Sequence, residues 1–162
     1  MGSEMCTRDR YTTVSADGMS VEHYRLGANG HTPTGTITLT AGSEVLSIDS
    51  VLSVDGVEAV AIASTFTNVF QTVVHDVDTG FATPVFFSAD APTVSITQNG
   101  DGTWLAVGFA EGGTAGSGGV HLYQRPHFAS AWLLHEIILS PYSSPDDNFG
   151  ADVSIGGDTL AI

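Results

Sequence analysis

Short apolar stretches alternate with turn residues along most of the chain. The recurring unit is an apolar-Ser-apolar phrase, a Gly/Asp turn and a second apolar stretch rich in alanine, and its copies begin at Leu52, Val94 and Val153. Asp-Gly and Gly-Asp pairs supply the positive φ that a tight hairpin needs. The pattern therefore predicts short antiparallel β-hairpins rather than helices.

Further predicted strands surround these copies. They cover residues 69–75 and 84–87 after the first copy, residues 120–124 and 132–139 after the second, and residues 21–26 and 36–40 before the first. In this alignment Tyr24 corresponds to Tyr123. A four-strand unit repeated every ~40–50 residues is typical of β-propeller blades.

The predicted fold class is all-β, with propeller blades of four antiparallel strands and about three blades' worth of strands. Residues 1–14 are predicted to be a disordered leader, and residues 15–162 to form the blades. The expected units are a half-blade at about 19–41, blades at about 44–88 and 92–140, and a half-blade at about 148–162.

The two half-blades are complementary in this prediction, because the chain starts with the last two strands of a blade and ends with the first two. Two interpretations follow. A homodimer could complete a shared ring of about six blades and satisfy every strand edge. Alternatively, the chain is a fragment of a larger propeller.

Composition narrows the function classes. Hydrophobic residues make up 42% of the chain and charged residues only 14%, with 19 glycines and a formal net charge of −14. Such acidity argues against nucleic-acid binding, which needs a basic face. No apolar run is long enough to predict a membrane span. Cys6 is the only cysteine, so no internal disulfide is possible.

Residues 117–162 resemble an FG-GAP repeat of the bacterial type, related to the blades of the integrin alpha-subunit head. The resemblance is carried by Gly118-Gly119-Val120-His121-Leu122-Tyr123, Trp132, Phe149-Gly150, Val153 and Gly157-Asp158-Thr159-Leu160-Ala161. It covers about a quarter of the chain well. Phe-Gly occurs in no other predicted blade, and the closing Gly-Ala-Pro of the family is absent.

The resemblance implies a ligand-binding or cell-adhesion scaffold, secreted or on a cell surface. Many blades of the family hold calcium in an Asp-rich loop. The nearest equivalent here is Asn99-Gly100-Asp101-Gly102, which has too few carboxylates and is predicted to be a polar hairpin turn. No cofactor is expected. The candidate calcium ligands are Asp146, Asp147 and Asn148, which offer three side-chain oxygens in one turn.

Two residues are candidate ligand-binding groups. Trp104, beside the Gly/Asp turn, could stack on a ring, and His127 lies in a predicted loop with Arg125 and Pro126. Asp76 is expected at a solvated strand end.

The function that these observations favour is a non-catalytic binding or interaction module that presents blade loops to a protein or glycan partner. The alternatives are a propeller enzyme, such as a glycan hydrolase or lyase with its site in the central funnel, and a structural piece of a longer ectodomain.

Overall fold

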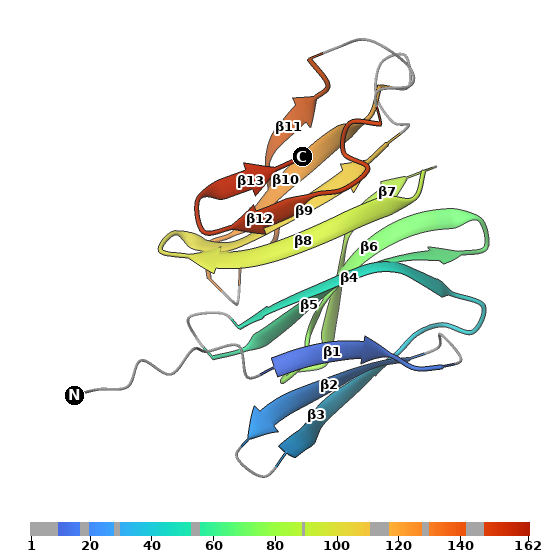
Figure 1. The fold of residues 1–162 in the computed structure, drawn as a ribbon, viewed down its shortest axis with the longest axis vertical. Coiled ribbons are helices and arrows are strands. Elements are labelled where there is room, and N and C mark those ends of the chain that lie inside the picture. Colours follow the sequence, from blue (N-terminus) through green and yellow to red (C-terminus); the bar gives the residue numbers. More distant parts are fainter. Residues whose placement is uncertain are drawn as a thin grey trace.

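The structure is a computed structural model that describes residues 10–16, 20–27, 30–52, 56–88, 90–110, 117–127, 130–141 and 148–162. Within these ranges the chain forms thirteen strands and no helix (Figure 1). The strands pair antiparallel in four sheets, which confirms the predicted all-β antiparallel class. The same ranges contain no helix that is long and apolar enough to span a membrane.

The first sheet has three strands in the order β1-β2-β3: β1 (Arg10–Val14), β2 (Ser20–Gly27) and β3 (Gly30–Thr38). β1 pairs with β2 from Arg10↔Arg25 to Val14↔Val21. The predicted disordered leader is therefore wrong for residues 10–14, where a run of Tyr, Thr and Val favours a strand once a partner edge is available. Residues 1–9 lie outside the described residues.

The second and third sheets have four strands each, and every strand lies beside its neighbour in the sequence. The second sheet consists of β4 (Glu44–Leu52), β5 (Glu58–Phe66), β6 (Val69–Asp76) and β7 (Phe81–Ser88). The third consists of β8 (Pro92–Asn99), β9 (Gly102–Phe109), β10 (Gly119–Arg125) and β11 (Leu133–Leu139). The sheets span the ranges 44–88 and 92–139.

The C-terminal hairpin consists of β12 (Ser154–Gly156) and β13 (Thr159–Ala161), joined through Gly157 with a φ of +57°. The apolar-Ser-apolar phrase lies on the strand before the turn both here and in β8. In the second sheet the phrase begins only at Leu52, at the end of β4, and its Ser53 and Val54 lie outside the described residues. The sequence phrase alone thus misplaces the first strand of the second sheet.

A β-bulge recurs at the same place in the first three sheets. On their last strands the ladder skips Thr34, Val85 and His135, which are about 50 residues apart. Tyr24 and Tyr123 each follow the bulge on the facing strand, which agrees with their predicted correspondence. A bulge at this position adds local twist to each of the three sheets.

The first three sheets stack face to face in chain order, with the first sheet at the bottom of Figure 1, and the hairpin lies against β8 and β9 of the third sheet. Alternate residues of β5 point to opposite sides, as a strand requires. Ala59, Ala61 and Ala63 join the apolar cluster shared with the third sheet, whereas Val60 and Ile62 join the cluster shared with the first. A third cluster joins Ala106 and Val120 to Val153 beside the hairpin.

The first strands β4, β8 and β12 are linked by side chains. The amides of Val94 and Ile96 on β8 donate to Ser47 Oγ and Asp49 Oδ2 on β4, at 3.2 and 2.9 Å. Ser95 Oγ in turn accepts the amide of Ile155 on β12 at 3.2 Å. β8 and β12 are edge strands of their own sheets, so these bonds satisfy amides that no strand pairs.

The Phe149-Gly150 pair has a steric role. A Cβ at Gly108 of β9 would overlap the carbonyl oxygen of Gly150, and Gly150 itself has a φ of +84°. Phe149 forms an isolated bridge with Gly118. Glycine at these positions therefore lets the segment before β12 lie directly against the third sheet.

No closed ring of sheets is present in the described part of the chain. The first sheet has three strands, whereas the half-blade expected at about 19–41 has two. β1 pairs with β2 at the position of a second blade strand. The first sheet therefore lacks one strand of a four-stranded blade, whereas the C-terminal hairpin has two strands.

Candidate functional site

Trp104, a predicted ligand-binding residue, lies half-buried on β9. Its indole Nε1 donates to Asn99 Oδ1 at 3.1 Å, and its ring packs edge-on against His135 with centroids 4.8 Å apart. Asn99 Oδ1 also accepts the amide of Asp101, so the Asn99–Gly102 segment is a hydrogen-bonded hairpin turn. These contacts give Trp104 a packing role in the third sheet.

His127, the second predicted ligand-binding residue, has an exposed side chain after β10. Its backbone oxygen accepts the amide of Ser130 at 2.9 Å, which closes a turn. Among the described residues no hydrogen bond or ring contact joins His127 to Trp104, so the two do not form one site.

The predicted calcium ligands are only partly visible. Asp146 and Asp147 lie outside the described residues. Asn148 is exposed, with a φ of +52°, and its backbone oxygen accepts the amide of Ala151. In the ranges that the structure describes, no group of three or more His, Cys, Asp or Glu side chains could hold a metal ion.

Asp76 differs from the expected solvated strand end. It is buried at the end of β6, where both carboxylate oxygens accept hydrogen bonds from Arg125 Nη1 of β10 at 2.8 and 2.9 Å. Arg125 is 2% exposed and its guanidinium lies over the ring of Trp132 at 4.8 Å. The pair joins the second and third sheets inside the stack, where substrate has no access.

A second buried pair of titratable side chains lies between the first and second sheets. His23 Nδ1 of β2 and Glu58 Oε1 of β5 are 3.6 Å apart, and the two side chains are 0% and 2% exposed. His23 Nε2 has no hydrogen-bond partner among the described residues. This geometry is looser than that of Asp76 and Arg125.

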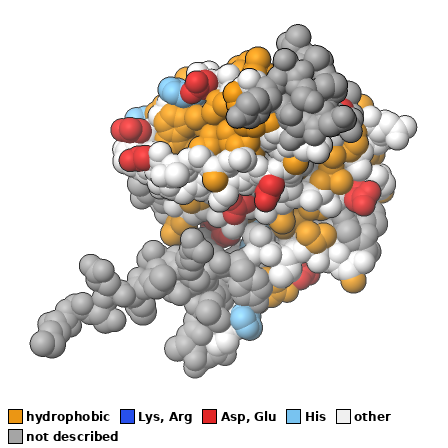
Figure 2. Space-filling model, turned by 45° about the horizontal axis from the view of Figure 1, so that its top comes forward, with side chains coloured by type: hydrophobic (Ala, Val, Ile, Leu, Met, Phe, Trp, Pro, Cys, Tyr) orange, Lys and Arg blue, Asp and Glu red, His pale blue; other side chains and the backbone are white. Residues whose placement is uncertain are grey.

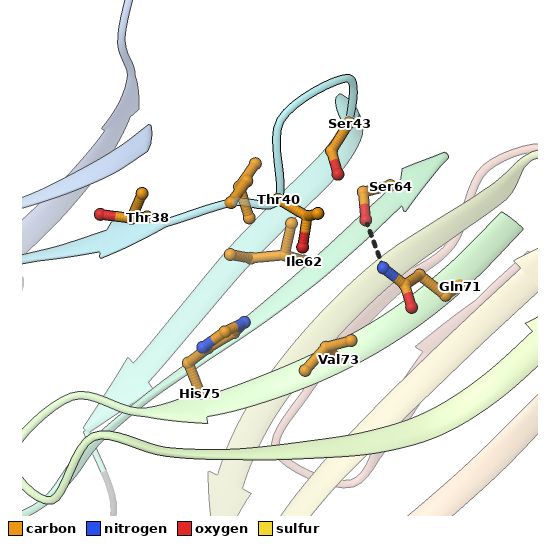
Figure 3. A pocket seen from close by; sticks show the side chains of 9 residues that line it. Thr38, Thr40, Ser43, Ile62, Ser64, Gln71, Val73 and His75 are labelled. Atoms are coloured by element: carbon orange, nitrogen blue, oxygen red, sulfur yellow. Dashed lines mark hydrogen bonds between the residues drawn. The ribbon is translucent and has the colours of Figure 1, made fainter. Parts of the chain in front are cut away.

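A small cavity of about 130 Å³ opens at this same junction between the first and second sheets (Figure 3). One wall is the connection from β3 to β4, with Thr40 and Ser43, and the other is the face of β5 and β6. There Gln71 Nε2 donates to Ser64 Oγ at 3.5 Å. The lining also has an apolar part, formed by Leu39, Ile62 and Val73.

His75 of β6 completes the lining. Burial lowers the pKa of its imidazole below the usual value of 6.5, and the nearby His23 lowers this pKa further. His75 is therefore neutral at neutral pH. The lining includes neither a carboxylate nor an arginine, although the chain has a net charge of −14.

Exposed apolar side chains lie on the outermost strands of the second and third sheets. On β7 Phe81 is 71% exposed, and on β11 a row of similar residues is about half exposed: Leu133, Leu134, Ile137 and Leu139. Figure 2 shows hydrophobic side chains gathered on the upper part of the molecule, with acidic groups near them and no lysine or arginine among the described side chains in view.

Sequence reasoning missed the cavity and both buried pairs. Gln71, Ser64 and Thr40 belong to no motif, and they meet only because the β3–β4 connection crosses the face of the second sheet. The sequence has only four arginines, and Arg125 directly follows the predicted strand at 120–124, but no motif pairs it with Asp76.

No family model, no curated protein and no solved structure matches this chain.

Proposed function

We propose that this chain is a non-catalytic binding or interaction module built from propeller-type blades. The proposal rests most on the stack itself. The first three sheets share a bulge at one position. The first strands of the second sheet, the third sheet and the C-terminal hairpin are linked through Ser47, Asp49 and Ser95. This arrangement is typical of blades that pack around a common axis and present their edges outward.

The charged groups favour binding over catalysis. A propeller enzyme needs acids or histidines that converge where substrate can reach them. The closest acid–base pairs of the described residues, His23–Glu58 and Asp76–Arg125, are buried between sheets instead. Their position suits a structural role in joining neighbouring sheets.

The outer strands offer a surface for a macromolecular partner. β11 is an edge strand with free backbone groups, and its row of exposed Leu and Ile side chains is the kind of apolar surface that marks interaction sites. An extended peptide could add to such an edge by main-chain hydrogen bonds. We therefore place the partner, a protein or a glycan, at the outer strands rather than in a catalytic funnel.

The proposal is tested by screening the protein on a glycan array and a panel of secreted and cell-surface proteins, beside a panel of chromogenic glycosides. We expect saturable binding to at least one array or panel member and no turnover. Ile137→Glu should weaken this binding at least about tenfold, because a charge in an apolar contact must be desolvated.

The matched control is Ala151→Glu, which adds the same charge at an exposed residue of the loop before β12. Binding that falls equally in both variants would contradict the assignment to β11. If the repurified protein reproducibly hydrolyses a glycoside, the non-catalytic proposal is wrong and the chain is an enzyme.

A further inference from the structure

The cavity between the first and second sheets selects against ions. Its polar lining consists of hydroxyls, the Gln71 amide and the imidazole of His75, with no charged side chain. An anion would find no cation there and a cation would find no carboxylate. Because a buried ion needs a partner of opposite charge, the lining suits only an uncharged ligand.

The lining groups can both donate and accept hydrogen bonds. The hydroxyls of Thr40 and Ser43 make no hydrogen bond to other described residues, and in Figure 3 they lie on the side of the connection that faces β5 and β6. Ser64, itself 2% exposed, accepts from Gln71 Nε2 and so fixes the amide of Gln71. The Gln71 carbonyl oxygen then points toward Val73 (Figure 3).

Apolar side chains complete a two-sided environment. Ile62 and Val73 form a floor beneath these polar groups. A ligand that matches this lining needs hydroxyl groups around its edge and C–H groups on its face, and a sugar ring has both.

The volume limits the ligand to one ring. A cavity of about 150 Å³ holds a single benzene molecule, and this cavity is about 130 Å³. Sites for drug-sized ligands measure ~300–1,000 Å³. A nucleotide or an oligosaccharide is therefore too large to enter whole.

We propose that the cavity formed by the β3–β4 connection and the face of β5 and β6 binds a single neutral sugar ring. The site is separate from the outer strands, so this proposal goes beyond the proposed function and does not depend on it. It places a small-molecule site at a junction between two sheets rather than on the loops.

The test is an NMR titration of the full chain, labelled with ¹⁵N, with methyl β-D-glucoside, methyl β-D-galactoside and methyl α-D-mannoside. We expect saturable shifts of the Ser64, Gln71 and His75 amides with at least one of them, with a Kd of about 1–10 mM for so small a ligand. Glucuronate and glucosamine, which are charged, should bind at least about tenfold more weakly.

Gln71→Ala should weaken binding about fivefold to tenfold by removing one donor and one acceptor. Gln124→Ala is the matched control, since Gln124 lies on β10 of the third sheet and donates to the Asp101 carbonyl, away from the cavity. The chemical-shift dispersion of each spectrum shows whether the variant is folded. If a variant is unfolded, the titration of the wild-type protein alone tests the proposal.

Three results would overturn the proposal: no saturable shift at the three amides with any glycoside, equal affinity for the charged sugars, or equal weakening by both variants. Glycan-array binding that persists in Gln71→Ala would leave the proposed function standing. The two proposals can therefore fail separately.

Discussion

The two junctions between neighbouring sheets differ in how completely they are packed. Between the second and third sheets, the small residues Ala59, Ala61 and Ala63 let the backbones approach, and Asp76 holds Arg125 at 2.8 and 2.9 Å. The junction between the first and second sheets holds a cavity instead, together with a histidine–glutamate pair 3.6 Å apart.

The difference suggests a division of roles within one repeated architecture. Between the second and third sheets the packing is close, so that any change of side-chain volume strains both backbones. This junction therefore has a structural role. The first junction leaves polar groups and space for a ligand. If the proposed sugar site is correct, stability and binding depend on different interfaces of the same stack, and substitutions can separate them.

The largest expected effect is at the tight junction. Asp76→Ala leaves the buried guanidinium of Arg125 without its carboxylate, so we expect a loss of about 3–5 kcal/mol in the free energy of unfolding. Urea titration followed by tryptophan fluorescence measures it, since Arg125 lies over Trp132. The control Asp152→Ala, at an exposed residue, should change stability by less than about 0.5 kcal/mol. Equal losses of stability in the two variants would mean that the Asp76–Arg125 pair does not stabilise the contact between the second and third sheets.

A smaller effect compares packing at the two junctions directly. Ala61→Val adds methyl groups where the second and third sheets meet and should cost about 1–3 kcal/mol. Val73→Ile adds one methylene beside the cavity and should change stability by less than about 0.5 kcal/mol. Thermal unfolding of both variants gives the comparison. If Val73→Ile were the more destabilising, the first junction would not be the looser one.

The smallest expected effect is a loss of stability at acidic pH. Because burial lowers the pKa of His75, the folded state disfavours its protonated form. Above the usual pKa of 6.5 the imidazole is neutral in both states, so its contribution to stability is intact. As the pH falls through this value, the unfolded chain binds the proton first and stability decreases.

His75→Gln removes this titration, so the fall in unfolding free energy between about pH 8 and about pH 5 should be smaller in the variant than in the wild type. Parallel urea titrations at several pH values measure the difference. A steeper fall in the variant would contradict the sign of the pKa shift.

The sequence predicted the hairpins well because their signals are local. Gly/Asp turns and runs of β-favouring residues predicted the strands of the third sheet and β5, β6 and β7 of the second, including the alanines of β5, whereas β4 was misplaced. β1 was missed because a strand of five residues in a polar segment has no periodic signal of its own and needs the edge of β2.

The candidate site could not be predicted for a different reason. A cavity depends on how two sheets stack, and residues such as Thr40 and Gln71 are ordinary surface types in the sequence. The same holds for Asp76, which is buried only because β10 of the next sheet brings Arg125 to it. Contacts between sheets depend on tertiary geometry that strand patterns do not specify.

Native-state hydrogen exchange tests the central claim, that the sheets are stacked with their first strands linked. The amides of Ile96 and Ile155 lie on edge strands and bond only to side chains of the preceding sheet, Asp49 and Ser95. We predict exchange at least about tenfold slower than for an unprotected amide, an opening free energy of about 1.4 kcal/mol or more. Asp49→Ala should remove this protection at Ile96 but not at Ile155. Unprotected exchange of both amides in the wild-type protein would contradict the stacked arrangement.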